Sequence, residues 1–474
     1  MLFPTVTFAI FFTVVLPVSW FLMPHQRAWR VFIFVASYVF YGWWDWRFVF
    51  LLAGSTIANH AFAVWIHRSA ARGRKALLGG ALVFNLGVLG YFKYTGFLIS
   101  STENALARLG FSAPTSMLAV TLPIGISFFT FMALSYVIDT YRGQLEPVSF
   151  ARFAVFLAFF PHLVAGPIVR ASELLPQLER PRDPRRVDTS RAFWLIFTGL
   201  FFKIVIANYL AAHIVDDVFA APARHSSLEV LVGTYGYAVQ IFADFYGYTN
   251  IAIGVALLLG FEFPQNFNAP YTAVSIQDFW RRWHMTLSRW LRDYLYIPLG
   301  GNRKGRLLTY RNLMLTMLLG GLWHGAAWTF VAWGGIHGTG LALGRLRGDL
   351  RARRGLPEPA DTAARRAVAR LVTFHVVCFA WIFFRADSFS TARDLIVRLF
   401  TAWGEPSPLV TWAVLAVIAL GIGSQYVPRE AVAGLVRRFE QLSIAGQAAC
   451  LALGLMLVDT LGPQGVEPFI YYRF

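Results

Sequence analysis

Cysteine and charged residues are both scarce in this sequence. The 474 residues include two cysteines, Cys378 and Cys450, and each lies in an apolar run. Two thiols placed in this way predict neither a disulfide framework nor a cysteine-ligated metal site. Charged residues make up 14% of the chain, whereas soluble domains average about 25%. The shortage of charge therefore excludes an ordinary soluble enzyme and indicates an integral membrane protein.

Several well-known catalytic motifs are also absent from the sequence. It has no phosphate-binding Walker loop, no His-Glu-x-x-His zinc motif, no Gly-x-Ser-x-Gly nucleophile motif and no Cys-x-x-Cys pair. Nucleotide hydrolysis, metal-dependent hydrolysis and serine-esterase chemistry therefore have no support, and we expect no bound metal.

Apolar and aromatic residues are correspondingly abundant. Hydrophobic residues make up 57% of the chain, which contains 16 Trp and 44 Phe. Most apolar runs are about 18 to 22 residues long and do not alternate with polar residues, which is typical of membrane helices rather than barrel strands. We predict an all-α polytopic membrane protein with about 10 to 13 transmembrane or re-entrant helices. No internal repeat or soluble segment divides the chain, so residues 1–474 are expected to form one membrane domain.

Basic residues outnumber acidic ones, 42 Lys and Arg against 25 Asp and Glu, which gives a net charge of +17. The basic residues gather in short loops between apolar runs, where they face anionic lipid and set the topology. Nucleic-acid binding is therefore not expected. The same rule predicts that both termini lie outside and that Leu346–Arg366 forms a polar cytoplasmic loop.

A basic and aromatic segment covers residues 277–305. From Gln277 to Leu295, aromatic and basic residues recur at helical spacing, which predicts an amphipathic helix at the membrane surface. Tyr296–Gly305 then breaks regular structure with Pro and paired Gly. The segment could hold an anionic donor through Arg281, Arg282, Asn302, Arg303 and Lys304. A positive-inside topology signal explains their charge equally well.

Two histidines, His324 and His337, are the only ionisable residues between Asn312 and Leu343. An ionisable group at membrane depth is costly and indicates a functional site, although a lone histidine on an apolar face is more often a packing residue. As one helix, this stretch would be roughly 48 Å long, well beyond a bilayer core of about 30 Å. We expect a broken or hairpin segment, with Gly320-Gly321 as the break.

Together these motifs resemble the membrane-bound O-acyltransferase family, and most of all its bacterial branch that O-acetylates exported polysaccharides such as alginate. The resemblance is carried by the segment from Asp278 to Lys304, by the core Leu322-Trp323-His324-Gly325-Ala326-Ala327-Trp328 and by His337. Phe40–Trp46, Asp244–Tyr248 and Asn266–Tyr271 are similar too, so the resemblance spans nearly the whole chain.

This resemblance implies helices around a central cavity and an O-acyltransferase, with acetyl as the expected group. His324 would take a proton from a hydroxyl as that hydroxyl attacks an acyl thioester. His284 and His337 are candidates to orient His324, with Asn266 and Asp278 as weaker ones; for each, a structural hydrogen bond is an equal alternative.

The resemblance also implies a donor, a compartment and partners. The donor would be cytosolic acetyl-CoA or a carrier-bound acyl thioester, and the protein would lie in a bacterial inner membrane with periplasmic termini. A periplasmic partner similar to SGNH hydrolases and the polysaccharide export machinery would complete the transfer. The alternatives are a transporter, which commonly shows repeated halves that this chain lacks, and a non-catalytic scaffold subunit of an export complex.

The chain ends in Phe469-Ile470-Tyr471-Tyr472-Arg473-Phe474. This Phe-x-Tyr-x-x-Phe pattern is similar to the end of a small accessory peptide in the D-alanyl-transfer branch of the family, where the tyrosine is implicated as acyl carrier. The similarity implies that Tyr471 carries the acyl group. An interfacial aromatic anchor explains the tail equally well.

Overall fold

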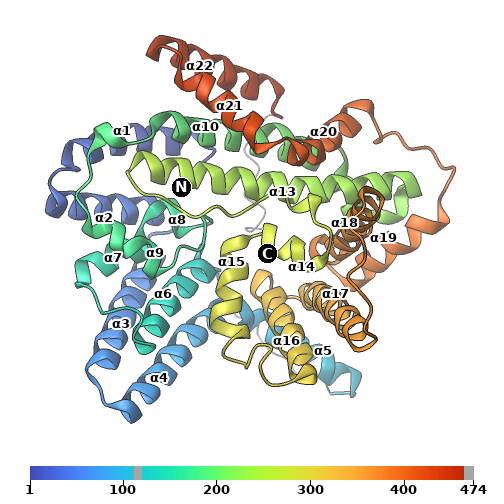
Figure 1. The fold of residues 1–474 in the computed structure, drawn as a ribbon, viewed down its shortest axis with the longest axis horizontal. Helices are drawn as coiled ribbons and strands as arrows, with labels where there is room; N and C mark the ends of the chain where they lie inside the picture. Colours follow the sequence, from blue (N-terminus) through green and yellow to red (C-terminus); the bar gives the residue numbers. More distant parts are fainter. Residues whose placement is uncertain (112–119, 464–474) are drawn as a thin grey trace. The chain divides into compact units, whose positions relative to one another are not determined.

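The computed structural model in Figure 1 describes residues 1–111 and 120–463. These residues form helices joined by turns and loops, and they contain no β-strand. The chain divides into two compact units: Met1–Thr189 with Ala252–Pro264, and Ser190–Ile251 with Gln265–Phe474. Whether the two units act as the single domain predicted from the sequence stays a prediction.

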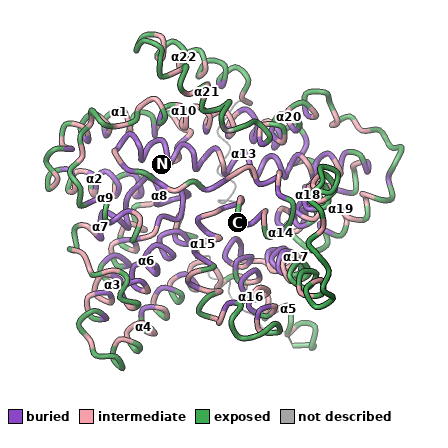
Figure 2. Tube along the Cα trace, in the orientation of Figure 1, coloured by how far each residue is buried: buried purple, intermediate pink, exposed green. Residues whose placement is uncertain are grey.

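Within the described residues, six helical segments are long and apolar enough to cross a membrane: Arg47–Arg68, Ala71–Arg108, Thr189–Ala220, Ser227–Leu258, Ala363–Arg385 and Ile444–Leu461. Three shorter apolar helices are Val6–Leu22, Ile126–Tyr141 and Trp412–Tyr426. Burial differs strongly among the six long segments (Figure 2). Of the most apolar 18 residues, 94% are buried in Ser227–Leu258 but 6% in Ile444–Leu461. The prediction of an all-α, multi-pass membrane protein is confirmed.

The first unit contains the helices of the N-terminal part of the chain. They are α1 (Val6–Leu22), α2 (Gln26–Gly42), α3 (Arg47–Arg68), α4 (Ala71–Leu89), α5 (Thr95–Arg108), α6 (Ile126–Tyr141), α7 (Phe150–Ala158), α8 (Phe160–Leu163) and α9 (Ala171–Glu179). Helices α3, α4 and α6 pack together. The side-chain amides of Asn59 on α3 and Asn85 on α4 exchange two hydrogen bonds of 3.1 and 2.7 Å. Such paired amides satisfy each other where water is scarce and join the two helices.

The second unit is larger. Its helices are α10 (Thr189–Leu200), α11 (Asn208–Leu210), α12 (Asp216–Ala220), α13 (Ser227–Leu258, whose last turns belong to the first unit), α14 (Ile276–Arg282), α15 (Met285–Leu291), α16 (Arg306–His324), α17 (Trp328–Arg353), α18 (Ala363–Arg385), α19 (Phe389–Thr401), α20 (Trp412–Gly423), α21 (Arg429–Glu440) and α22 (Ile444–Leu461). Helix α13 continues without a break through Gly247 and Thr249.

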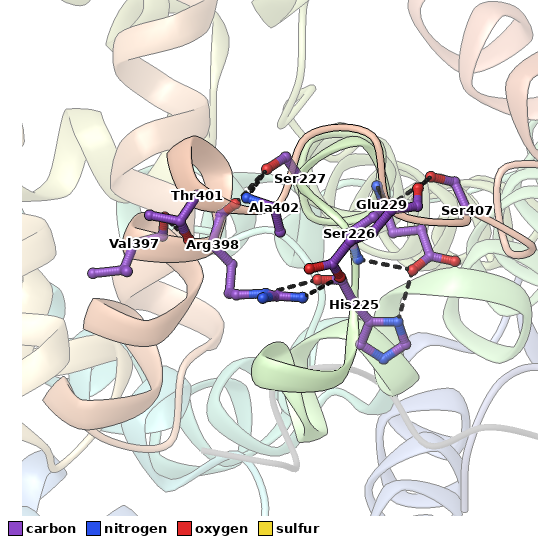
Figure 3. Close-up of polar contacts among 10 residues, drawn as sticks. His225, Ser226, Ser227, Glu229, Val397, Arg398, Thr401, Ala402 and Ser407 are labelled. Atoms are coloured by element: carbon purple, nitrogen blue, oxygen red, sulfur yellow. Dashed lines mark hydrogen bonds and ion pairs between the residues drawn. The ribbon is translucent and has the colours of Figure 1, made fainter.

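A buried carboxylate anchors the beginning of α13 (Figure 3). Glu229 accepts hydrogen bonds from the backbone N–H of Ser226 at 3.2 Å and of Leu409 at 3.0 Å. The Ser227 hydroxyl donates to the carbonyl of Arg398 at 2.6 Å. An acidic side chain near a helix N-terminus complements the helix dipole. The hydrogen bonds of this cluster join the beginning of α13 to α19 and to the chain that follows it.

Further along, α13 packs closely against the π-helical turn Phe201–Ala207 that follows α10. A Cβ at Gly199 would lie 2.6 Å from the carbonyl oxygen of Gly247, and a Cβ at Gly247 would lie 2.6 Å from that of Gly199. Beside this contact, Lys203 Nζ and Asp244 Oδ1 form a buried ion pair of 2.6 Å. The two glycines permit the close approach, and the pairing offsets part of the cost of burying two charges.

Helices α16 and α17 form a tight hairpin. A Cβ at Gly321 would lie 2.2 Å from the carbonyl oxygen of Phe330, and a Cβ at Gly334 would lie 2.3 Å from that of Met317. The hairpin prediction is therefore confirmed, but the predicted break at Gly320-Gly321 is wrong. Gly321 lies within α16, where the missing side chain admits α17, and the helix ends at His324.

Two further segments differ from their predictions. The expected helix from Gln277 to Leu295 is interrupted: α14 ends at Arg282, and His284 has a left-handed backbone (φ 40°) before α15 begins. The predicted loop Leu346–Arg366 is helical at both ends, since α17 runs to Arg353 and α18 begins at Ala363. The helical spacing of aromatic and basic residues continues across the two-residue turn between α14 and α15. Periodicity alone therefore did not reveal that turn.

Candidate functional site

His324 is the last residue of α16, and 2% of it is exposed. Its ring is surrounded by aromatic rings at centroid distances of 5.1 Å for Trp323, 5.0 Å for Trp333 and 5.3 Å for Phe384. Gly325 follows in an extended conformation, and a Cβ there would lie 2.0 Å from the ring of Phe330. The glycine therefore lets Phe330 cover the end of α16 and helps to enclose the imidazole.

His284 is the second histidine of this cluster. It is fully buried in the turn between α14 and α15, and its ring centroid lies 6.3 Å from that of His324. The ring of Phe245 packs edge-on against it at 4.7 Å. Burial lowers the pKa of His284 to about 3, because removing the imidazolium from water disfavours the charged form. The imidazole is therefore neutral at physiological pH.

Asn266 contacts His284 directly. Its Oδ1 lies 3.0 Å from His284 Nδ1, and it accepts hydrogen bonds from the Thr286 hydroxyl at 2.9 Å and the Thr286 backbone N–H at 3.3 Å. The carbonyl oxygen of Asn266 also accepts from the backbone N–H of Met285 at 2.8 Å. The sequence analysis weighed Asn266 as a residue that orients His324; in the structure it holds the neighbouring His284.

His337 lies in α17 and is fully buried. The indole N–H of Trp280 donates to its Nδ1 at 3.2 Å, and its ring stacks on Phe279 at 5.8 Å with an interplanar angle of 15°. Trp333, which also contacts His324, lies 4.8 Å from it. His337 is thus part of the packing of the same aromatic cluster, and its Nδ1 is occupied as an acceptor.

Asp278, the other weak candidate, has a local structural role. Its carboxylate accepts from Arg282 at 2.9 Å and from the backbone N–H of Val274 at 3.2 Å. Arg282 is therefore paired within its own helix, which leaves less of its charge for a ligand. Arg281 of the same turn is exposed.

The other predicted donor-binding residues lie in the glycine turn before α16. Asn302, Arg303 and Lys304 are exposed there. Gly300 and Gly301 have φ values of 113° and 54°, which other residues rarely adopt. From α16, the amide of Asn312 donates to the carbonyl of Gly301 at 3.0 Å and so anchors the turn. The structure thus presents these three side chains on an anchored surface loop.

Two other expectations concern Tyr471 and metals. Tyr471 lies outside the described residues. Across residues 1–111 and 120–463, no group of three or more His, Cys, Asp or Glu side chains is placed to hold a metal ion.

The sequence analysis named Trp323 beside His324 but missed the two enclosing aromatic residues that come from other helices. Trp333 and Phe384 come from α17 and α18, and their order in the chain does not indicate that they meet at α16. Abundant Trp and Phe in a membrane protein is the usual sign of lipid-facing or interfacial positions, so their number could not single them out.

The chain is similar in sequence to one known family and to several named proteins. Residues 80–384 match the MBOAT, membrane-bound O-acyltransferase family. The chain is 41% identical over 382 residues to the probable alginate O-acetylase of Pseudomonas aeruginosa, covering 79% of this chain and 70% of that protein. It is 39% identical to the enzyme of the same name from Pseudomonas putida, with 95% of both chains covered. Identity to the peptidoglycan O-acetyltransferase of Helicobacter pylori is 36%, over 77% of this chain and 73% of that protein. The chain is therefore a member of the membrane-bound O-acyltransferase family and an acyltransferase enzyme.

Proposed function

We propose that this acyltransferase moves acetyl groups from a cytosolic thioester, acetyl-CoA, toward the hydroxyl groups of an exported polysaccharide or cell-envelope glycan. The observation that carries the proposal is the pair of buried imidazoles, His324 and His284, in a protein whose relatives are named for O-acetylation of alginate and peptidoglycan. The inner membrane of a bacterium, with both termini in the periplasm, is the location that fits this task.

His324 acts as the general base in this proposal. Its imidazole takes the proton of the acceptor hydroxyl while the oxygen forms a bond to the thioester carbonyl carbon. The carbon–sulfur bond then breaks, the thiolate leaves, and the proton passes from His324 to that sulfur. The aromatic enclosure of Trp323, Trp333 and Phe384 supports this role, because exclusion of water protects the thioester from hydrolysis.

The glycine turn gives the donor a place to bind. Arg303 and Lys304 are exposed cations that can pair with the phosphates of coenzyme A, and Asn302 and Arg281 add polar groups. Arg282 contributes less, because Asp278 already holds its guanidinium. The competing explanation, a signal that keeps this loop inside, predicts no effect of these residues on donor affinity.

Tyr471 serves as the intermediate carrier in this proposal, and a periplasmic hydrolase-like partner of the export machinery completes the transfer. A phenol has a pKa near 10, so its ester is more activated than an alkyl ester. Intact-mass measurement of protein incubated with acetyl-CoA without the partner should show an added acetyl group that Tyr471→Phe loses. Tyr472→Phe, a change of the adjacent tyrosine, should keep the adduct. Full glycan acetylation by Tyr471→Phe would leave the tail as a membrane anchor.

Labelled acetyl-CoA tests whether the protein transfers acetyl groups through His324. Membranes carrying the wild-type chain should pass the label to a covalent acyl product, while membranes carrying His324→Ala at equal protein level should not. Equal labelling by both would indicate a scaffold or transporter. Competition with an acetylated carrier protein then separates the two classes of donor.

A further inference from the structure

We propose that Asn266 is a positioning residue that fixes the single proton of the His284 imidazole on Nδ1, so that Nε2 presents an unprotonated acceptor inside the histidine cluster. The role assigned below to that acceptor rests on the proposed function of His324. The tautomer itself does not depend on that function.

The first step concerns which atom of the Asn266 amide faces His284. The backbone N–H of Thr286 points to this atom at 3.3 Å, and a backbone N–H can only donate a hydrogen bond. The atom must therefore be the carbonyl oxygen, since a rotated amide would place one donor against another. In this orientation Asn266 Nδ2 has no hydrogen-bond partner among the described residues. The orientation of the amide is therefore assigned from the contacts of Oδ1 alone.

The second step assigns the proton of His284. Oδ1 of Asn266 is an acceptor, and it lies 3.0 Å from His284 Nδ1, so Nδ1 must carry the hydrogen. A neutral imidazole has one N–H, and Nε2 is therefore the nitrogen with the free lone pair. Nε2 is buried, and no donor to it is found within residues 1–111 and 120–463. A buried acceptor of this kind is costly unless a step of the reaction supplies a donor.

The third step concerns the backbone. His284 has a φ of 40°, in the left-handed region that a non-glycine residue rarely occupies. Asn266 secures this turn twice, through its side chain to Thr286 and through its carbonyl to the Met285 N–H. A further hydrogen bond between the same two segments, from the Asn268 N–H to the Arg282 backbone carbonyl, is 2.9 Å long. Strained backbone that several hydrogen bonds hold in place is typical of functional positions.

His337 provides a second case in which a neighbouring side chain sets the tautomer of a buried histidine. The Trp280 indole N–H can only donate, so His337 Nδ1 must accept and its proton lies on Nε2. Two buried imidazoles in one aromatic cluster thus have opposite tautomers, each set by one neighbour. The ring centroids of His284 and His324 lie 6.3 Å apart, and an Nε2 lone pair directed toward His324 would stabilise the imidazolium that His324 becomes when it takes a proton. A hydrogen on Nε2 would oppose that charge.

Solid-state NMR of protein with ¹⁵N- and ¹³C-labelled histidine, reconstituted in lipid, tests the assignment. The ring shifts of His284, identified by their loss in His284→Gln, should report the Nδ1–H tautomer, and those of His337 the opposite one. Asn266→Ala should shift His284 toward a mixture, while Asn266→Asp, which keeps an acceptor, should retain Nδ1–H. Thr286→Val removes another contact of the same oxygen and should also retain it.

The transfer rate provides the second readout. Asn266→Ala should lower kcat about tenfold, less than the roughly 10²- to 10⁴-fold loss expected when a general base itself is removed, with little change in donor KM. Asn266→Asp should restore most of the rate. An Nε2–H signal in the wild type, or an unchanged tautomer in Asn266→Ala, would overturn the inference. If Asn266→Ala does not fold, the wild-type and Asn266→Asp spectra still decide. Activity retained by His324→Ala would instead refute the proposed function and leave the tautomer assignment intact.

Discussion

The imidazole rings of His284 and His324 lie 6.3 Å apart between centroids, at an angle of 59°. One comes from the turn between two short helices, α14 and α15, and the other from the end of α16. Both are buried, and Trp323 lies against both rings. This relationship places two buried imidazoles next to each other in the second unit.

Acid should destabilise the protein through His284. Its pKa is about 3 in the folded state and 6.5 for an unperturbed histidine, so the stabilising neutral form is fully present above pH 6.5. As the pH falls below 6.5, His284 binds a proton in the unfolded chain but not in the folded one, so the free energy of unfolding decreases. At pH 5.5 the loss is about 1.4 kcal/mol.

Thermal unfolding in detergent at pH 7.5 and 5.5 measures this loss. The wild type should lose more stability between the two values than His284→Gln, whose side chain does not titrate. A general destabilisation of the variant would lower both of its melting temperatures and leave this difference visible. Parallel pH dependence of the two proteins would contradict the buried neutral imidazole.

The α16–α17 hairpin should distinguish sharply between two adjacent glycines. A Cβ at Gly334 would lie 2.3 Å from the Met317 carbonyl oxygen, whereas a Cβ at Gly335 would lie 3.7 Å from Leu318 Cδ2, an ordinary contact. Gly334→Ala should therefore destabilise the protein by about 1–3 kcal/mol, as overpacking does. Gly335→Ala should be neutral or slightly stabilising, because alanine favours helix. Melting temperatures in one detergent compare them, and equal effects would mean that the helices separate easily.

The glycine turn should control donor affinity. Arg303→Glu combined with Lys304→Glu should raise the apparent KM for acetyl-CoA about 3- to 10-fold, given up to about 1 kcal/mol for each exposed pairing, and leave kcat unchanged. The matched control is Arg353→Glu with Arg354→Glu, an exposed basic pair at the end of α17. The KM shift should shrink at high salt. An identical KM in all three proteins would reduce the turn to a topology signal.

The sequence predicted the parts of this structure that depend on length and apolar pattern. The stretch containing His324 and His337 is too long for one crossing, and it is a hairpin. Apolar runs likewise predicted the membrane helices, because a helix satisfies its own backbone in lipid whatever its neighbours are.

The parts that were missed depend on contacts distant in sequence. Asn266 meets His284 because two irregular segments pair, and no periodicity links them. Gly321 looked like a helix break, yet its role depends on Phe330 of the facing helix. Propensity assigns glycine a cost within a helix, and here close packing of α17 overrides it.

The most direct test compares two buried histidines of one hairpin. His324→Gln and His337→Gln remove imidazoles that share Trp333 as a neighbour, so both variants perturb the same packing. Single-turnover acyl transfer from labelled acetyl-CoA by purified, folded protein should fall about 10²- to 10⁴-fold in His324→Gln, the range for a lost general base, and less than tenfold in His337→Gln. Retention of more than half the wild-type rate by His324→Gln would contradict the role of His324 as general base.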